Sequence, residues 1–106
     1  MSNLIFLNDK IIKETEGLLS TLDRGFLYGD GLFETLRTYG KTPFRLEDHV
    51  VRLSNSAQYF DIPFHYTSQQ IRQIIEHLLT GNNLKDAYIR MTLSRGLGFN
   101  GLIPTD

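Results

Sequence analysis

The sequence has 106 residues, a formal net charge of −1 at pH 7 and a pI near 6.3, and 41% of its residues are hydrophobic. This is the size of one domain and the composition of a globular chain, and the balanced charge argues against a nucleic-acid-binding protein and a polybasic membrane-binding surface. The sequence contains no cysteine, which excludes disulfides and thiolate metal sites, and its three histidines lack the spacing of metal ligands, so we expect no metal site. The N-terminal apolar run of four residues is too short for a signal peptide or a membrane span, so we expect a cytoplasmic protein.

The N-terminal part of the chain alternates between short apolar runs and turn-forming residues. Residues 4–7 and 10–13 flank the turn formers Asn8 and Asp9, which predicts a β-hairpin. Three glycines interrupt residues 21–31, which predicts a loop or a short helical turn. Residues 32–39 then alternate as a strand, with Phe33, Thr35, Arg37 and Tyr39 on one face and Leu32, Glu34, Leu36 and Thr38 on the other.

A turn at Gly40 and Lys41 is expected to lead into a partner strand over residues 42–45, where Pro43 favours an edge position. The next segment, 46–60, is predicted to be a helix because its apolar residues recur at steps of three and four. This stripe consists of Leu46, Val50, Leu53, Ala57 and Phe60.

A second helix is predicted to begin at Thr67, whose spacing to Gln70 is that of a capping box, and to stop at Gly81. Residues 87–94 alternate as a further strand, and residues 95–106 are expected to form a glycine-rich loop. The order of elements predicts an α+β domain, with a mainly antiparallel sheet and two helices on one face. Because the last residues follow a loop and complete no element, we expect the chain to be part of a longer protein; a frayed natural terminus is the alternative.

The candidate binding residues are arginines. His49 and Arg52 lie three apart on the first helix, so Arg52 could bind a phosphate or could be an ordinary surface residue. Arg37 lies between aromatic residues on one strand face, where it could pair with a carboxylate or face solvent or a subunit partner, and Arg90 and Arg95 allow the same two interpretations. Glu34 is expected to form a structural ion pair. No serine-hydrolase motif and no dinucleotide or P-loop glycine pattern is present.

Three segments carry a resemblance to a known family: DRGFLYGDGLFETLR, FRLEDHVVRL and YIRMTLSRG. Together they resemble the small N-terminal domain of the fold-type IV (class IV) pyridoxal-phosphate enzymes, which include branched-chain aminotransferases, D-amino-acid aminotransferases and aminodeoxychorismate lyases. The resemblance covers nearly all of residues 1–106 and implies one small domain of a two-domain, dimeric enzyme. It implies that Arg52 binds the phosphate of pyridoxal 5′-phosphate. It also implies that Phe33 lies on the substrate side of the cofactor and that Arg37 lies near the substrate carboxylate.

The resemblance also implies what this chain lacks. The lysine that forms the Schiff base belongs to the large C-terminal domain of the family, and none of the four lysines here, Lys10, Lys13, Lys41 and Lys85, matches it. We therefore expect no catalytic residue in this chain and no activity from it alone.

The subtype within this family is predicted from fewer residues. The position of the carboxylate-binding arginine of D-amino-acid aminotransferases is Asn100 here, and the Gly-Arg-Gly of the lyases is absent. A branched-chain or broad aminotransferase, homodimeric and acting on an amino acid and a 2-oxo acid, is the first prediction. An aminodeoxychorismate lyase is the first alternative, and a complete, non-catalytic binding or dimerisation module is the second.

Overall fold

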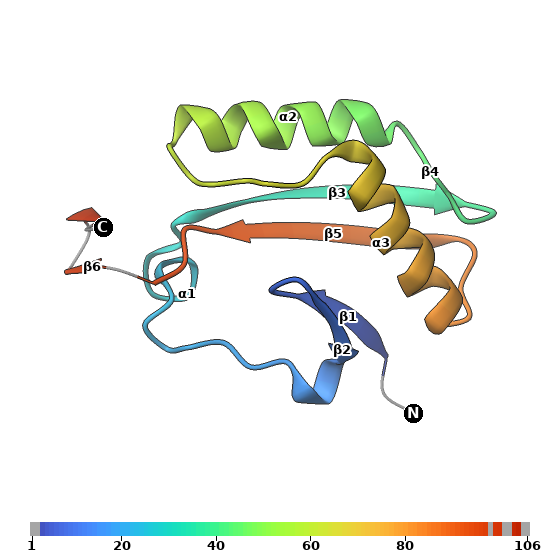
Figure 1. The fold of residues 1–106 in the computed structure, drawn as a ribbon, viewed down its shortest axis with the longest axis horizontal. Coiled ribbons are helices and arrows are strands. Elements are labelled where there is room, and N and C mark those ends of the chain that lie inside the picture. Colours follow the sequence, from blue (N-terminus) through green and yellow to red (C-terminus); the bar gives the residue numbers. More distant parts are fainter. Residues whose placement is uncertain (1–2, 98, 101–102, 105–106) are drawn as a thin grey trace.

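The computed structural model describes residues 3–97, 99–100 and 103–104. The molecule is flattened, and its two long strands, β3 and β5, run side by side (Figure 1). The elements are β1 (Leu4–Leu7), β2 (Lys10–Lys13), a 3-10 turn (Glu14–Glu16), α1 (Arg24–Tyr28), β3 (Gly31–Tyr39), β4 (Thr42–Pro43), α2 (Leu46–Tyr59), α3 (Ser68–Gly81), β5 (Ala87–Ser94), β6 (Phe99–Asn100) and β7 (Ile103–Pro104).

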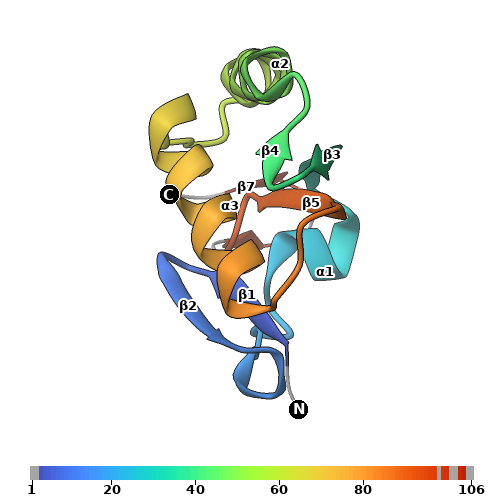
Figure 2. The ribbon, with the colours of Figure 1, turned by 90° about the vertical axis from the view of Figure 1, so that its right-hand side faces the viewer.

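The central sheet is antiparallel, with strand order β4-β3-β5, and β3 pairs with β5 along almost its whole length. The hairpin β1–β2 is a separate two-stranded sheet that lies beside α3 (Figure 2). Asn82, directly after α3, fastens this hairpin: its side-chain oxygen accepts from the Leu4 N–H at 2.6 Å and its amide donates to the Leu4 carbonyl at 3.0 Å. The antiparallel sheets and the helices together confirm the predicted α+β class.

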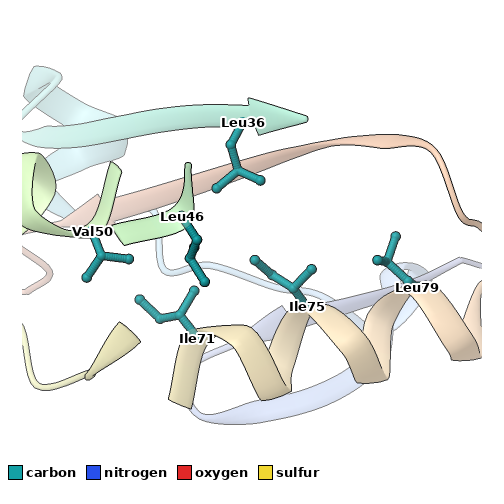
Figure 3. Packing of buried hydrophobic residues seen from close by; sticks show 6 residues of the cluster. All are labelled: Leu36, Leu46, Val50, Ile71, Ile75 and Leu79. Atoms are coloured by element: carbon teal, nitrogen blue, oxygen red, sulfur yellow. The ribbon is translucent and has the colours of Figure 1, made fainter. Parts of the chain in front are cut away.

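The hydrophobic core lies between the sheet and the two long helices (Figure 3). The strand β3 contributes one buried leucine, and alternation places Ala87, Ile89 and Met91 of β5 on the same side. The opposite face of the sheet is not covered, since Phe33, Tyr39 and Tyr88 are each more than half exposed. Within the described part of the chain, α2 and α3 thus both pack on one face of the sheet. The core cluster consists of Leu36, Leu46, Val50, Ile71, Ile75 and Leu79.

Both helices match their predictions closely. α2 ends at Tyr59, with Phe60 as its capping residue. α3 has the predicted capping box: the Thr67 hydroxyl accepts from the Gln70 N–H at 3.1 Å, and the Gln70 side chain accepts from the Thr67 N–H at 2.8 Å. The segment 21–31 contains the expected short helical turn as α1, and Gly29, with φ 67°, closes it in the left-handed conformation.

Two local predictions were wrong. The strand predicted at 42–45 ends at Pro43, because Arg45 has φ 54° and is the N-cap residue directly before α2, so it does not continue the ladder. The predicted terminal loop contains the short antiparallel pair β6–β7.

The predicted end of α3 at Gly81 is confirmed, but the glycine has a different physical role there. It has no left-handed φ. A Cβ at this position would lie 2.5 Å from Leu4 Cδ1, so the glycine makes room for the N-terminal hairpin.

Thr38 joins β3 to the start of β5 by its side chain. It is fully buried, and its hydroxyl donates to the Lys85 carbonyl at 2.9 Å and accepts from the Ala87 N–H at 3.0 Å. Replacing Thr38 with Val keeps the shape but removes the partner of a buried amide, so we expect a loss of about 1–3 kcal/mol. Native-state hydrogen exchange of the β3 and β5 amides measures it. Thr35→Val, at an exposed position of the same strand, is the control, and equal effects of the two changes would contradict the prediction.

Candidate functional site

Glu34, His49 and Arg52 form one group, which we call the Arg52 cluster. α2 carries His49 and Arg52 one turn apart, and Glu34 comes from β3, on the face that the helix covers. The Glu34 Oε1 atom lies 2.8 Å from His49 Nδ1 and 3.1 Å from Arg52 Nη2. The predicted proximity of His49 to Arg52 and the predicted ion pair of Glu34 are both confirmed.

The cluster is buried at one end and open at the other. The side chains of Glu34 and His49 are 14% and 18% exposed, whereas that of Arg52 is 62% exposed. Arg52 lines a shallow surface groove along α2, together with Arg45, Asn55 and Ser56. Asp48 also lines this groove and pairs with Arg45, so Arg52 is the guanidinium there that is suited to bind an anion with several oxygens, such as a phosphate.

A second candidate surface lies on the uncovered face of the sheet. We call it the arginine–aromatic face; its residues are Phe33, Arg37, Tyr39, Tyr88 and Arg90. The Arg37 guanidinium carbon lies 4.9 Å from the centre of the Tyr88 ring and 5.3 Å from that of Tyr39, and the Arg90 carbon lies 4.3 Å from that of Phe33. The faces of the aromatic rings attract these cations, and guanidinium N–H groups are suited to bind a carboxylate.

The three predicted binding residues are not in one cluster. Phe33 and Arg37 alternate with Glu34 along β3, so they lie on the opposite side of the sheet from the Arg52 cluster. The two surfaces are connected through the backbone of β3, where Phe33 and Glu34 are neighbours. Tyr88 was not predicted as a binding residue, although the alternation of residues 87–94 places it on the same strand face as Arg90.

A buried ion cluster joins the ends of β3 and β5. Asp30 lies 2.8 Å from Arg24 Nε and 2.7 Å from Arg95 Nε, and the Arg24 side chain is only 2% exposed. Partial burial by itself would raise the pKa of Asp30, but the hydrogen bonds and positive charges of the two arginines outweigh it and lower this pKa below its usual value. Arg95 also donates to the carbonyls of Phe60 and Asp61, at the end of α2. Of the two interpretations predicted for Arg95, the structure supports pairing with a carboxylate, and this carboxylate is Asp30 of the same chain at 2.7 Å.

Sequence reasoning did not pair these residues: Arg24 and Asp30 are six residues apart in one segment, but Arg95 is 65 residues beyond Asp30, and no local pattern shows that it joins them. The four lysines are all exposed, and none belongs to the Arg52 cluster or to the arginine–aromatic face. Among the described residues, no three His, Cys, Asp or Glu side chains gather as metal ligands. No helix in the described part of the chain is long and apolar enough to cross a membrane.

The family model described as "Amino-transferase class IV" matches residues 31–106. The chain belongs to this family. A Methanocaldococcus jannaschii protein, which its name provisionally assigns as a branched-chain-amino-acid aminotransferase, is 41% identical over 100 residues, or 94% of this chain and 35% of its own length. The aminodeoxychorismate lyase of Bacillus subtilis is 34% identical over 102 residues, again 94% of this chain and 35% of the relative.

Solved structures of this family have the same fold. The Escherichia coli branched-chain amino acid aminotransferase superposes with a TM-score of 0.88 at 26% identity, over 99% of this chain and 36% of that one. The T.th. branched-chain amino acid aminotransferase in complex with N-(5′-phosphopyridoxyl)-L-glutamate superposes with a TM-score of 0.85 at 29% identity, over 97% of this chain and 36% of that one. This class IV chain therefore spans about a third of the length of the relatives and structures that it matches.

Proposed function

We propose that this chain is the N-terminal part of a pyridoxal-phosphate-dependent aminotransferase that moves an amino group between an amino acid, branched-chain in the first instance, and a 2-oxo acid. The observation that carries the proposal is the Arg52 cluster, in which the exposed Arg52 of α2 pairs with Glu34 of β3. The fold that holds this cluster superposes on a branched-chain aminotransferase solved with a phosphopyridoxyl ligand. The M. jannaschii and E. coli relatives support the branched-chain assignment.

The residues of this chain fit the phosphate end of the cofactor. Arg52 offers a planar fork of donors at an exposed position, and this geometry suits a phosphate. When bound, pyridoxal 5′-phosphate supplies the aldehyde and the electron-withdrawing ring that amino-group transfer requires. Since none of the four lysines lies at either candidate surface, we infer that the lysine of the covalent link is supplied from outside this chain.

The arginine–aromatic face is proposed to lie on the substrate side. Phe33 would shape the space for the substrate side chain, and Arg37, held between Tyr39 and Tyr88, would attract a carboxylate.

We also propose a homodimer, supported by exposed apolar residues before and within α1, such as Leu18 at 82% and Phe26 at 66% exposed. Sedimentation of the full-length protein tests this, and a monomer would contradict it.

Replacing Arg52 with Ala in the full-length protein is expected to weaken retention of pyridoxal 5′-phosphate by about 10–100-fold, because one charge-assisted contact contributes about 1.5–3 kcal/mol. Absorbance titration of the apoprotein with the cofactor measures the dissociation constant. Arg45→Ala is the matched control, since Arg45 lines the same groove and is similarly exposed but is paired with the exposed Asp48 at 2.8 Å. An unchanged dissociation constant for the Arg52 variant would remove the phosphate role from this residue.

A second candidate function is elimination of pyruvate from aminodeoxychorismate, which the 34% identity to the B. subtilis lyase favours. The full-length protein should be assayed in parallel with branched-chain amino acids plus a 2-oxo acid, with D-alanine plus a 2-oxo acid, and with aminodeoxychorismate. Turnover in the first assay alone supports the proposal. Pyruvate release in the third supports the lyase, and a complete absence of turnover favours a non-catalytic binding or dimerisation module.

A further inference from the structure

We propose that Glu34 is a positioning residue for Arg52: its carboxylate fixes the guanidinium in the orientation that receives a phosphate monoester. This inference rests on the proposed phosphate role of Arg52. Glu34 itself is placed within the sheet, behind the arginine, and contacts it at 3.1 Å.

The two side chains of this contact, Glu34 and Arg52, differ in how firmly the fold holds them. Glu34 belongs to the long strand β3, where it stands opposite Met91 of β5, and its side chain is 14% exposed. Arg52 extends from α2 and is 62% exposed, so by itself its long side chain would sample many rotamers in water. The contact therefore attaches a mobile cation to a rigid support.

His49 fixes the carboxylate in turn. A carboxylate only accepts hydrogen bonds, so the 2.8 Å contact requires that His49 Nδ1 carries a proton and donates it to Glu34 Oε1. The same nitrogen then has no lone pair for Arg52, whose Nη2 lies 3.3 Å away. Glu34 Oε1 thus accepts from His49 and forms the ion pair with Arg52, so His49 holds this oxygen in place for the arginine.

The geometry also leaves the arginine able to bind. The contact with Glu34 uses Nη2, at one corner of the planar group, so Nε and Nη1 are not part of it. Because the ordering of the side chain is completed during folding, it does not have to occur when the ligand binds. The negative charge of Glu34 acts against an anion, so the positioning effect and the charge effect have opposite signs and can be separated by substitution.

The experiment compares two ligands that differ only in the phosphate. Full-length apoprotein is titrated with pyridoxal 5′-phosphate and with pyridoxal. The dissociation constant of pyridoxal divided by that of pyridoxal 5′-phosphate is the ratio that reports the phosphate contact alone, and a weaker phosphate contact lowers it. Glu34→Ala should weaken pyridoxal 5′-phosphate about 10-fold and leave pyridoxal within about 2-fold, since the loss is one positioned contact. Glu34→Gln, which retains an acceptor at the same place without the charge, should keep the wild-type ratio or improve it.

Two further variants complete the test. Glu34→Asp keeps the charge but withdraws the oxygen by one methylene, so it should lower the ratio; compared with Glu34→Gln, it decides the matter even if the alanine variant does not fold. The double variant Glu34→Ala with Arg52→Ala should bind pyridoxal 5′-phosphate no more weakly than Arg52→Ala alone. Glu47→Ala is the matched control. Glu47 is an exposed acid on α2, the helix that carries Arg52, and it accepts a hydrogen bond from Ser68.

The outcomes separate this inference from the function on which it rests. If Glu34→Ala weakens both ligands equally, or if the double variant is additive, Glu34 is only structural and the inference fails. If Arg52→Ala weakens pyridoxal 5′-phosphate while no Glu34 variant does, the inference fails and the proposed function stands. If Arg52→Ala has no effect on the ratio, the phosphate role itself falls, and the positioning role falls with it.

Discussion

Replacing Asp30 with Ala is expected to lower the stability of the β3–β5 region by about 3 kcal/mol, because it leaves the buried Arg24 guanidinium without this carboxylate. The effect should lie near the lower end of the roughly 3–5 kcal/mol range for broken buried ion pairs, since the Asp30 side chain is 20% exposed whereas that of Arg24 is 2% exposed. Native-state hydrogen exchange of the β3 and β5 amides in the full-length protein measures the loss. An exposed pair, tested by Asp48→Ala beside Arg45, is the control and should change stability by less than about 1 kcal/mol.

The contribution of Asp30 should also depend on pH, with a defined sign. Its pKa in the folded protein is lowered by Arg24 and Arg95, so its contribution is present above the unfolded-state pKa of about 3.9 and is lost as the pH falls through the lower, folded value. The stability difference between wild type and Asp30→Asn should therefore be constant near neutral pH and shrink below about pH 4. A difference that grows on acidification would contradict the assigned direction.

Replacing Ile75 with Ala is expected to cost about 2–5 kcal/mol. Ile75 is 2% exposed and lies in the middle of the core cluster, so truncation leaves a cavity between α3 and the sheet (Figure 3). Hydrogen exchange of the α3 and β5 amides is again the measurement.

The matched control for Ile75 is Ile11→Ala, on the exposed strand β2, where the same side chain is 37% exposed. We expect this change to cost about 1 kcal/mol, less than at Ile75, since more than a third of this side chain is already exposed to water. Similar losses at both positions would mean that the core cluster does not hold the helix to the sheet.

The elements with a regular apolar period were predictable from the sequence. The stripes on 46–60 and on the second helix, and the alternation along 32–39 and 87–94, follow from contacts that each segment makes with the core. Phe60, predicted as the last member of the first stripe, is the exception, since it lies after α2 and is 51% exposed. The differences lie where the rest of the fold overrides local preference. Arg45 turns the chain out of the sheet at φ 54°, and Gly81 leaves room for the side chain of Leu4, which is 77 residues earlier in the chain.

The candidate site divides in the same way. The proximity of His49 and Arg52 is a property of helical spacing, so the sequence determined it, along with the helices, the strands and the family resemblance that suggests a phosphate for Arg52. Only the tertiary structure decided that Glu34 supports Arg52 from β3, that Phe33 and Arg37 face away from it, and that Asp30 joins Arg24 to Arg95. The physical reason is that periodicity records which face of each segment is buried, whereas an ion pair depends on how two distant segments are placed against each other, and no local pattern encodes that placement.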